Sequence, residues 1–294
     1  MTKPPDPRTH PYRADLAAEV LRGVVPAPRY VEGALKQVAH GATPLWSRPD
    51  ASLGWASQLL HGELVRCYEE KDGWAWVQAL CDSYVGYVHA EALSLYSQAA
   101  THRVTVPGTF VYAAPDAKAL TGLHLAMNAL VCVAEPGATF ARLAGGGFVP
   151  ACHLGGIDEA ASDFVAVAEQ FVGTPYVWGG KTRLGLDCSG LVQVAMHAAG
   201  GPCPRDSDLQ MTELGTPVET GRDLDGVQRG DLIFWKDHVA IVSHASTLLH
   251  ANAHRMAVAS EPLRLAVDRI AKSGSPVVTI KRPATPRAGL KLFP

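Results

Sequence analysis

One cysteine of the sequence, Cys188, lies where a thiol can become a nucleophile. Two glycines precede it and Gly190 follows it closely, so the chain can turn tightly there. Apolar residues then recur at helical spacing over 191–198, until the glycine pair that begins at Gly200. Cys188 is therefore expected in the first turn of a helix, where free N–H groups and the helix dipole lower a thiol pKa of roughly 8.5. The alternative is a small buried apolar side chain, the usual role of an unpaired cysteine.

Two histidines downstream supply a candidate base and a group to orient it. A thiol nucleophile needs a proton acceptor nearby, and the ring of that acceptor must be held in place. Residues 230–235 and 238–243 have the composition of two strands joined by a short turn, and residues 247–252 form a third. Side chains two residues apart share one face of a strand, so antiparallel pairing of the last two strands brings His238 and His250 together. The sequence thus predicts a Cys–His–His group.

Five short motifs resemble, in content and order, the NlpC/P60 family of papain-like cysteine peptidases. The match extends over residues 156–285, and it is specific only as a set. One departure is Ala240, where the family commonly has glycine, and it adds a methyl group beside the predicted catalytic histidine. The motifs are Tyr-Val-Trp-Gly-Gly at 176–180, Asp-Cys-Ser-Gly at 187–190, Arg-Gly-Asp-Leu at 229–232, His-Val-Ala-Ile at 238–241 and His-Ala at 250–251.

The resemblance implies a role for each member of this group. Cys188 would be the nucleophile, His238 the general base and acid, and His250 the residue that orients the His238 ring. The Cys188 backbone N–H at the helix start would stabilise the oxyanion that forms when sulfur attacks an amide carbonyl. Tyr176 either lies in the same pocket or packs under the turn with its hydroxyl satisfied locally.

Other histidines and cysteines offer competing interpretations. His238, His244, His250 and His254 contain an i, i+4 pair that resembles a zinc site, but no His-Glu-x-x-His motif is present and the region is predicted as strands. Six cysteines could form disulfides, yet the chain has no Cys-x-x-Cys pair and is long enough to build an apolar core. We therefore expect no metal, no cofactor and reduced thiols.

Length, charge and the first residues limit the class of protein. A chain of 294 residues is long enough for about two domains. A net charge of -2 and an isoelectric point near 6.6 argue against a nucleic-acid partner. The start, Met-Thr-Lys-Pro-Pro-Asp-Pro, has no apolar signal region, and no stretch approaches the ~20 apolar residues of a membrane span. We expect a cytoplasmic protein with no membrane partner, although a removed signal peptide gives the same evidence; the oligomeric state stays open.

The first half of the chain differs from the second in composition and in the pattern of its apolar residues. Residues 1–35 are rich in proline and charge around one possible helix at 13–21, so we interpret them as an N-terminal arm. Residues 36–98 and 99–154 consist of short alternating segments separated by turn residues, which is typical of small β-barrels. The first region resembles a bacterial SH3-like domain, and the second resembles a degenerate copy. Residues 155–294 form the predicted peptidase domain.

The SH3-like resemblance carries an expectation about the substrate. In relatives with this organisation, the first barrel closes one end of the groove and supplies a glutamate and a tyrosine that recognise a free amino terminus. Glu63 and Tyr84 match those motifs, and Asp187, Ser189 and Tyr176 could complete the set of donors and acceptors. Glu63 could equally be an exposed strand carboxylate, and the barrels could be passive spacers or wall-binding modules.

Arg205, after the predicted nucleophile helix, has two open interpretations. It lies in Pro-Arg-Asp-Ser-Asp-Leu-Gln at 204–210, which resembles a family segment that borders the groove. Its guanidinium could bind a substrate carboxylate with both nitrogens, or it could pair with Asp206 or Asp208.

Together these observations predict an α+β, papain-like domain, in which the Cys188 helix and a helix at 159–172 pack on an antiparallel sheet, behind two small SH3-like β-barrels. Val172 is expected on the buried face of that second helix, with Phe164, Val165, Ala168 and Phe171. The predicted activity, which follows from the resemblance, is hydrolysis of the bond between γ-D-glutamate and a diamino acid such as diaminopimelate. The substrates would be short muropeptides with a free N-terminal L-alanine, in murein peptide recycling. The alternatives are an amidase or acyltransferase with the same Cys–His–His centre and a wall-binding module without catalysis.

Overall fold

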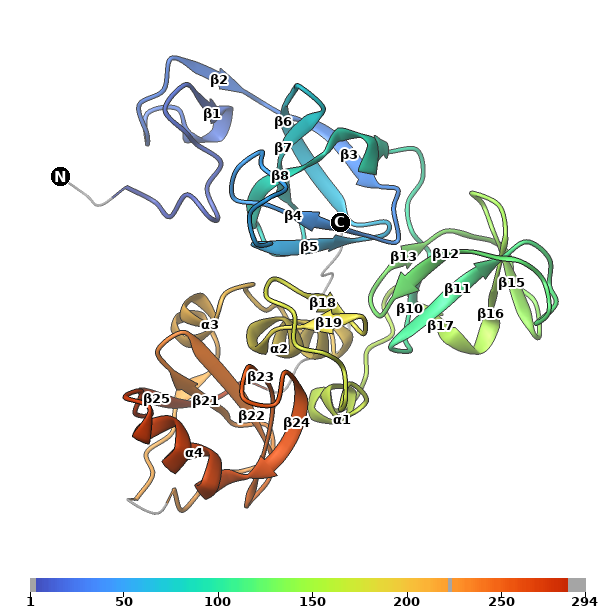
Figure 1. Ribbon diagram of the computed structural model, residues 1–294. Coiled ribbons are helices and arrows are strands. Elements are labelled where there is room, and N and C mark those ends of the chain that lie inside the picture. Colours follow the sequence, from blue (N-terminus) through green and yellow to red (C-terminus); the bar gives the residue numbers. More distant parts are fainter. Residues whose placement is uncertain (1–3, 222–223, 285–294) are drawn as a thin grey trace. The chain divides into compact units, whose positions relative to one another are not determined.

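The computed structural model describes residues 4–221 and 224–284, which separate into two compact units between Ile157 and Asp158 (Figure 1). The remaining residues of the predicted arm, 1–3, and of the predicted peptidase domain, 222–223 and 285–294, lie outside the described residues. No helix in the part of the chain that the structure describes is both long and apolar enough to cross a membrane. Each unit is described by itself below.

The N-terminal arm is extended rather than helical. The helix predicted at 13–21 is wrong: β1 (Leu16–Ala18) pairs in parallel with β2 (Arg29–Val31), and only one 3-10 turn follows, at Glu19–Leu21. All three residues of β1 are buried, and they pack in one cluster with Tyr68 and Trp76 of the sheet that follows. This burial of successive side chains outweighs the helical preference of the segment, because a strand can bury both faces between neighbours.

The first SH3-like region is built on an antiparallel sheet of five strands in the order β8-β7-β6-β3-β9. Alternate side chains of its strands, Val65 and Cys67 on one and Ala75 and Val77 on the next, point into a common apolar core. A two-stranded pair, β4–β5, adds Leu45 and Leu59 to that core. The strands are β3 (Ala34–Val38), β4 (Ala42–Leu45), β5 (Ser57–Leu60), β6 (Leu64–Lys71), β7 (Trp74–Ala79), β8 (Val85–His89) and β9 (Leu93–Leu95), with a 3-10 turn at Ala90–Ala92.

Residues 102–156 form two further sheets of short strands. These sheets have the orders β13-β10-β17 and β12-β11-β16-β15-β14, and both are antiparallel where their strands pair. Strand β12 was not predicted, because Gly122 and His124 interrupt its apolar pattern. The strands are β10 (His102–Val104), β11 (Gly108–Tyr112), β12 (Thr121–Ala126), β13 (Leu130–Val131), β14 (Val133–Glu135), β15 (Phe140–Leu143), β16 (Phe148–Pro150) and β17 (Leu154–Gly156), with a 3-10 turn at Ala151–His153.

The second unit has the predicted α+β architecture. Its sheet of six strands has the order β20-β25-β21-β22-β23-β24, and α2 packs against β22 and β23 (Figure 1). Every residue of α2 is buried, so this helix forms the centre of the unit. The elements are α1 (Phe164–Glu169), β18 (Lys181–Thr182), β19 (Gly185–Leu186), α2 (Cys188–Ala198), α3 (Ser207–Glu213), β20 (Thr216–Pro217), β21 (Leu232–Trp235), β22 (His238–His244), β23 (Thr247–Asn252), β24 (Ala257–Pro262), α4 (Leu263–Lys272) and β25 (Thr279–Arg282).

The helix expected at 159–172 is shorter than predicted. Asp163 caps α1 by accepting a hydrogen bond from the Val165 N–H, and the helix ends at Glu169. Val172 is 53% exposed, so its predicted burial is wrong, because it follows the end of the helix and leaves the buried face.

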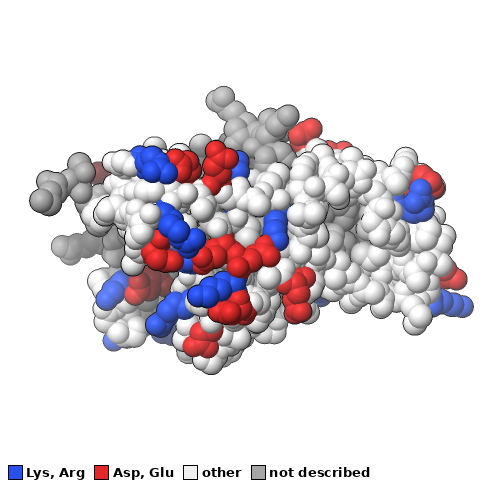
Figure 2. All heavy atoms as spheres, turned by 90° about the horizontal axis from the view of Figure 1, so that it is seen from above, with Lys and Arg blue, Asp and Glu red and all other residues white. Residues whose placement is uncertain are grey.

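Charged side chains on the face shown in Figure 2 alternate in sign rather than gathering by sign. Opposite charges also pair at Glu69, which binds the guanidinium groups of Arg13 and Arg29. Such a surface offers no field that would concentrate a polyanion.

Candidate active site

Cys188 is the first residue of α2, and its side chain is buried. Asp187 caps the helix: its Oδ1 accepts a hydrogen bond from the Gly190 N–H at 2.7 Å, and its Oδ2 accepts one from the Gly179 N–H at 2.7 Å. One carboxylate therefore ties the glycine turn to the helix start. Only glycine fits at position 190, because a Cβ there would lie 2.2 Å from the carbonyl oxygen of Gly180.

Arg205 binds the carboxylate of this cap. Its two terminal nitrogens lie 3.0 and 2.6 Å from Oδ1 and Oδ2 of Asp187, and one of them also donates to the Ser189 hydroxyl at 2.8 Å. Asp187 is a partner that neither interpretation of Arg205 included, because the loop after α2 folds back under the first turn of the helix. With 1% of its side chain exposed, Arg205 is not available to a substrate carboxylate.

Gln210 of α3 supports the same turn. Its Nε2 donates to the carbonyl oxygens of Ser189 at 2.9 Å and Pro204 at 2.8 Å. The turn that carries the thiol is thus held by two buried side chains that follow it in the sequence.

His238 and His250 lie together on one face of the sheet. The predicted antiparallel pairing of their strands is confirmed, with Ile241 opposite Leu249 and Val242 opposite Leu248. This register places the two histidines diagonally across β22 and β23. His238 Nε2 is 2.8 Å from His250 Nδ1, so the rings share one hydrogen bond.

Two further residues extend this contact, and the sequence did not reveal them. His250 Nε2 is 2.6 Å from Oε1 of Glu261 on β24, and Arg269 of α4 donates to the same oxygen at 2.6 Å. Neither β24 nor α4 was predicted, so no sequence pattern indicated that Glu261 and Arg269 lie near the histidines. The segment 257–262 shows no alternation of apolar residues, because its two buried residues, Val258 and Glu261, are three positions apart.

The Cys188 thiol faces strand β22. A backbone hydrogen bond from Val239 reaches the sulfur, and α2 packs on this strand. His238 directly precedes Val239, so the strand that carries the imidazole passes the thiol. The structure thus joins His238 to His250 and packs the Cys188 helix against the strand of His238.

Burial dominates the electrostatics of this site. It raises the pKa of the Cys188 thiol to about 12, with a further rise from the Asp187 carboxylate, against the opposing effects of Arg205 and two backbone N–H groups. Burial also lowers the pKa of His238 to about 3. The lowered thiol pKa expected from the helix start is thus wrong, because desolvation of the thiolate outweighs the helix terminus. Burial thus favours the neutral forms of the thiol and the imidazole in the free site.

Tyr176 lies close to these charged groups. Burial raises the pKa of its hydroxyl to about 12, and the charges of Cys188, Asp187 and Arg205 also act on it. Its backbone N–H donates to the Met256 carbonyl at 2.9 Å. The phenol therefore lies near the thiol and the cap of its helix.

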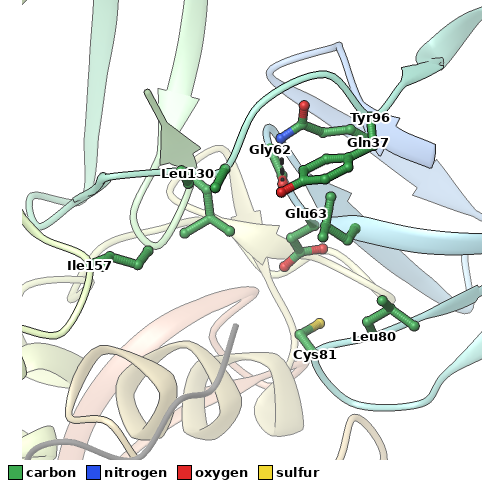
Figure 3. Close-up of a pocket in the computed structure, with 11 residues that line it drawn as sticks. Gln37, Gly62, Glu63, Leu80, Cys81, Tyr96, Leu130 and Ile157 are labelled. Atoms are coloured by element: carbon green, nitrogen blue, oxygen red, sulfur yellow. Dashed lines mark hydrogen bonds between the residues drawn. The ribbon is translucent and has the colours of Figure 1, made fainter. Parts of the chain in front are cut away.

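Glu63 lines a separate pocket within the first unit (Figure 3). It is buried, and its Oε2 accepts a hydrogen bond from the Leu60 N–H at 3.0 Å, so it is not an exposed strand carboxylate. Tyr84 does not line this pocket, because its side chain points into the apolar core of the sheet. The tyrosine that faces the pocket is Tyr96, which the sequence did not single out. The cavity of about 30 Å³ admits one or two water-sized groups.

The other cysteines and histidines form no second centre. No disulfide joins the six cysteines, all of which lie within 4–221 and 224–284, and no group of three or more potential metal ligands occurs in those ranges. His244 and His254 are exposed.

Both parts of the chain match known protein families. Residues 173–268 match the NlpC/P60 family, and residues 45–93 match the bacterial dipeptidyl-peptidase SH3 domain. The crystal structure of an NlpC/P60 family protein from Bacillus cereus is similar over 85% of this chain and 99% of that chain, with a TM-score of 0.72 and 20% identity. This likeness establishes a shared fold.

Two curated proteins are similar over about a third of this chain. The dipeptidyl-peptidase 6 of Lysinibacillus sphaericus is 38% identical over 88 residues, which are 30% of this chain and 31% of that protein. The gamma-D-glutamyl-L-lysine dipeptidyl-peptidase of Bacillus cereus is 32% identical over 112 residues, which are 35% of this chain and 32% of that protein. The chain spans about a third of the length of these relatives.

Proposed function

This chain carries an NlpC/P60 domain behind a dipeptidyl-peptidase-type SH3 domain, and on that premise we propose that it is a cysteine peptidase that cleaves the γ-D-glutamyl-diamino acid bond of short cell-wall peptides. One observation carries the proposal. The buried thiol at the start of α2 faces the strand of His238, whose ring is fixed by His250. Relatives named for γ-D-glutamyl dipeptidyl-peptidase activity support the choice of bond.

The geometry supports an acylation step in which both partners start neutral. Nε2 of His238 is engaged by His250, so Nδ1 is the nitrogen left to face the thiol. As Cys188 Sγ bonds to the γ-carbonyl carbon, its proton moves to Nδ1 and the carbonyl electron pair moves onto oxygen. The Cys188 N–H, which has no acceptor within the helix at this first position, is placed to bind that oxyanion.

The second half of the reaction reuses the same groups. When the oxyanion collapses, the C–N bond breaks, and the departing amine of the diamino acid takes the proton from His238. Water then attacks the thioester and gives a proton to His238, which returns it to the sulfur as the C–S bond breaks. Both steps use His238 as base and then as acid, which a fixed ring favours.

Recognition of the amino terminus is the second part of the proposal. Glu63 offers a buried carboxylate to a pocket that admits only a small group, and the Tyr96 side chain faces the same space (Figure 3). A buried carboxylate stabilises an ammonium group strongly, so this pocket suits the free α-amine of an N-terminal L-alanine. Tyr96 lines this pocket, whereas Tyr84 does not.

Two finer points complete the proposal. We place the SH3-like sheets in closed barrels, supported by the bridge between Trp46 after β4 and Tyr87 on β8. Murein peptide recycling in the cytoplasm is the proposed setting, a compartment in which cysteine side chains such as those of this chain are kept as thiols.

Product analysis tests the proposal. The protein is incubated with L-Ala-γ-D-Glu-diaminopimelate, and the products are identified by mass spectrometry. Release of L-Ala-D-Glu and diaminopimelate in equal amounts is expected. Cys188→Ser and His238→Gln should abolish it, whereas the exposed cysteine variant Cys152→Ser should retain full rate.

Three results would overturn this assignment. The first is turnover of ester or lipid amide substrates with no peptide cleavage. The second is full activity in Cys188→Ser. The third is tight binding to sacculi by a wild-type protein that cleaves no muropeptide.

A further inference from the structure

The series of hydrogen bonds that begins at His238 does not end at His250. It continues to Glu261, which is 9% exposed, and to Arg269 on α4, over successive contacts of 2.8, 2.6 and 2.6 Å. We propose that Glu261, held by Arg269, is a positioning residue that fixes the tautomers of His250 and His238 and so aims an unprotonated nitrogen at the Cys188 thiol. This inference deepens the proposed function and rests on it.

The direction of each hydrogen bond in this series follows from the donor at its far end, Arg269. Arg269 only donates, so the Glu261 oxygen that it contacts is an acceptor. That oxygen must then receive the proton of His250 Nε2, which leaves Nδ1 of a neutral His250 as an acceptor. His238 Nε2 must therefore carry the hydrogen of the next bond, and His238 Nδ1 keeps its lone pair. The carboxylate sets both tautomers without touching the thiol.

Charge favours the ionised state of Glu261. The hydrogen bond from His250, and then that from Arg269, hold the pKa of this carboxyl at about 2, against the effect of burial. Around His238, burial and the charge of Arg269 lower the imidazole pKa, and the charge of Glu261 raises it. Glu261 is thus also placed to stabilise the imidazolium that forms during catalysis.

The test compares Glu261→Gln with Asp268→Asn, which changes an exposed carboxylate on α4 beside Arg269. Glutamine keeps the size of the side chain and can accept the same hydrogen bond, but it has no charge and can also turn its NH₂ group to His250. Imidazole ¹⁵N NMR of the substrate-free protein reports the tautomer of each ring. The wild type and Asp268→Asn should show the Nε2–H form of both histidines, and Glu261→Gln should show a mixture.

Kinetics and titration give two further readouts. Glu261→Gln should lower kcat by about 10-fold or more at nearly unchanged KM, since groups that orient a catalytic ligand typically have effects of this size. The NMR pKa of His238 should fall in Glu261→Gln and rise in Arg269→Met. A role in stability alone predicts neither these opposite shifts nor the tautomer mixture.

The outcomes separate this inference from the function that it assumes. Identical tautomers and identical His238 pKa in wild type and in folded Glu261→Gln would overturn the positioning role, whatever the enzyme cleaves. The NMR measurements need no substrate. If no muropeptide is cleaved but the tautomers shift as expected, the proposed substrate fails and the positioning role stands.

Discussion

The guanidinium of Arg205 binds both carboxylate oxygens of Asp187, at 3.0 and 2.6 Å, directly beneath the turn that carries Cys188. Asp187 also accepts hydrogen bonds from the Gly179 and Gly190 N–H groups and from the Ser189 hydroxyl. These five donor contacts fill the roughly four acceptor sites of a carboxylate. Asp187 and Ser189 therefore hold the turn that carries the nucleophile. They could bind a substrate amine only if some of these hydrogen bonds were broken.

Replacement of Arg205 by methionine should strongly destabilise the second unit. The variant leaves the Asp187 charge buried without its cation, and breaking a buried pair in this way typically costs about 3–5 kcal/mol. Urea unfolding followed by circular dichroism measures the free energy of unfolding. Arg255→Met, which removes an exposed arginine, should change it by less than about 0.5 kcal/mol. Equal effects of the two substitutions would contradict a stabilising role for the pair.

Alkylation of Cys188 by iodoacetamide should be slow near neutral pH and should accelerate as the pH rises above 8. Burial raises the pKa of this thiol to about 12, and only the thiolate reacts, so the rate follows the small thiolate fraction. Mass spectrometry of the peptide that contains Cys188 gives the rate at each pH, and the exposed Cys152 in the same sample is the reference. A fast rate that stays constant down to pH 5 would instead show a preformed thiolate–imidazolium pair.

The sequence predicted the reactive side chains better than the residues that hold them in place. Cys188, His238 and His250 could be found because a glycine-bounded turn and two short strands have local signatures, and the pairing of those strands followed from the turn between them. Glu261 could not be found, since its strand is short and its contact with His250 depends on a register set by tertiary packing. Arg205 was singled out, but its partner was not, because Asp187 lies 18 residues earlier in the chain, at the N-cap of α2.

The first unit shows the same division between local and long-range information. Alternation along β6 and β7 was visible in the sequence, whereas the arm was misread as a helix because its burial comes from Tyr68 and Trp76 on distant strands. Tyr84 fitted a motif, but its side chain points into the core, and Tyr96 faces the pocket instead. Direction of a side chain in an irregular segment is not a property of local sequence.

The free energy of unfolding should fall as the pH is lowered from about 6.5. In the folded protein the pKa of His238 is about 3, below its usual 6.5, so the unfolded chain binds a proton in this range that the folded chain does not. Glu261 acts in the same direction at lower pH, because its folded pKa of about 2 lies below its usual 4.5. Urea midpoints measured between pH 7.5 and 5 give the slope.

Two histidine variants check this assignment. His238→Gln should flatten the slope between pH 6.5 and 5, whereas His254→Gln, at an exposed position, should leave it unchanged. An unchanged slope in His238→Gln would show that other groups cause the acid sensitivity.

Acetylation of the substrate amine should reduce kcat/KM by about 100-fold or more. Loss of one member of a buried charge pair typically costs about 3–5 kcal/mol, and 3 kcal/mol corresponds to about 10² in kcat/KM. Glu63→Gln should produce a similar loss with the free peptide and little further loss with the acetylated one, because both changes break the same pair. Glu91→Gln, an exposed carboxylate of the same unit, is the control and should discriminate between the two peptides as the wild type does. Equal rates of the wild type on free and acetylated peptides would exclude the Glu63 pocket as the amine site.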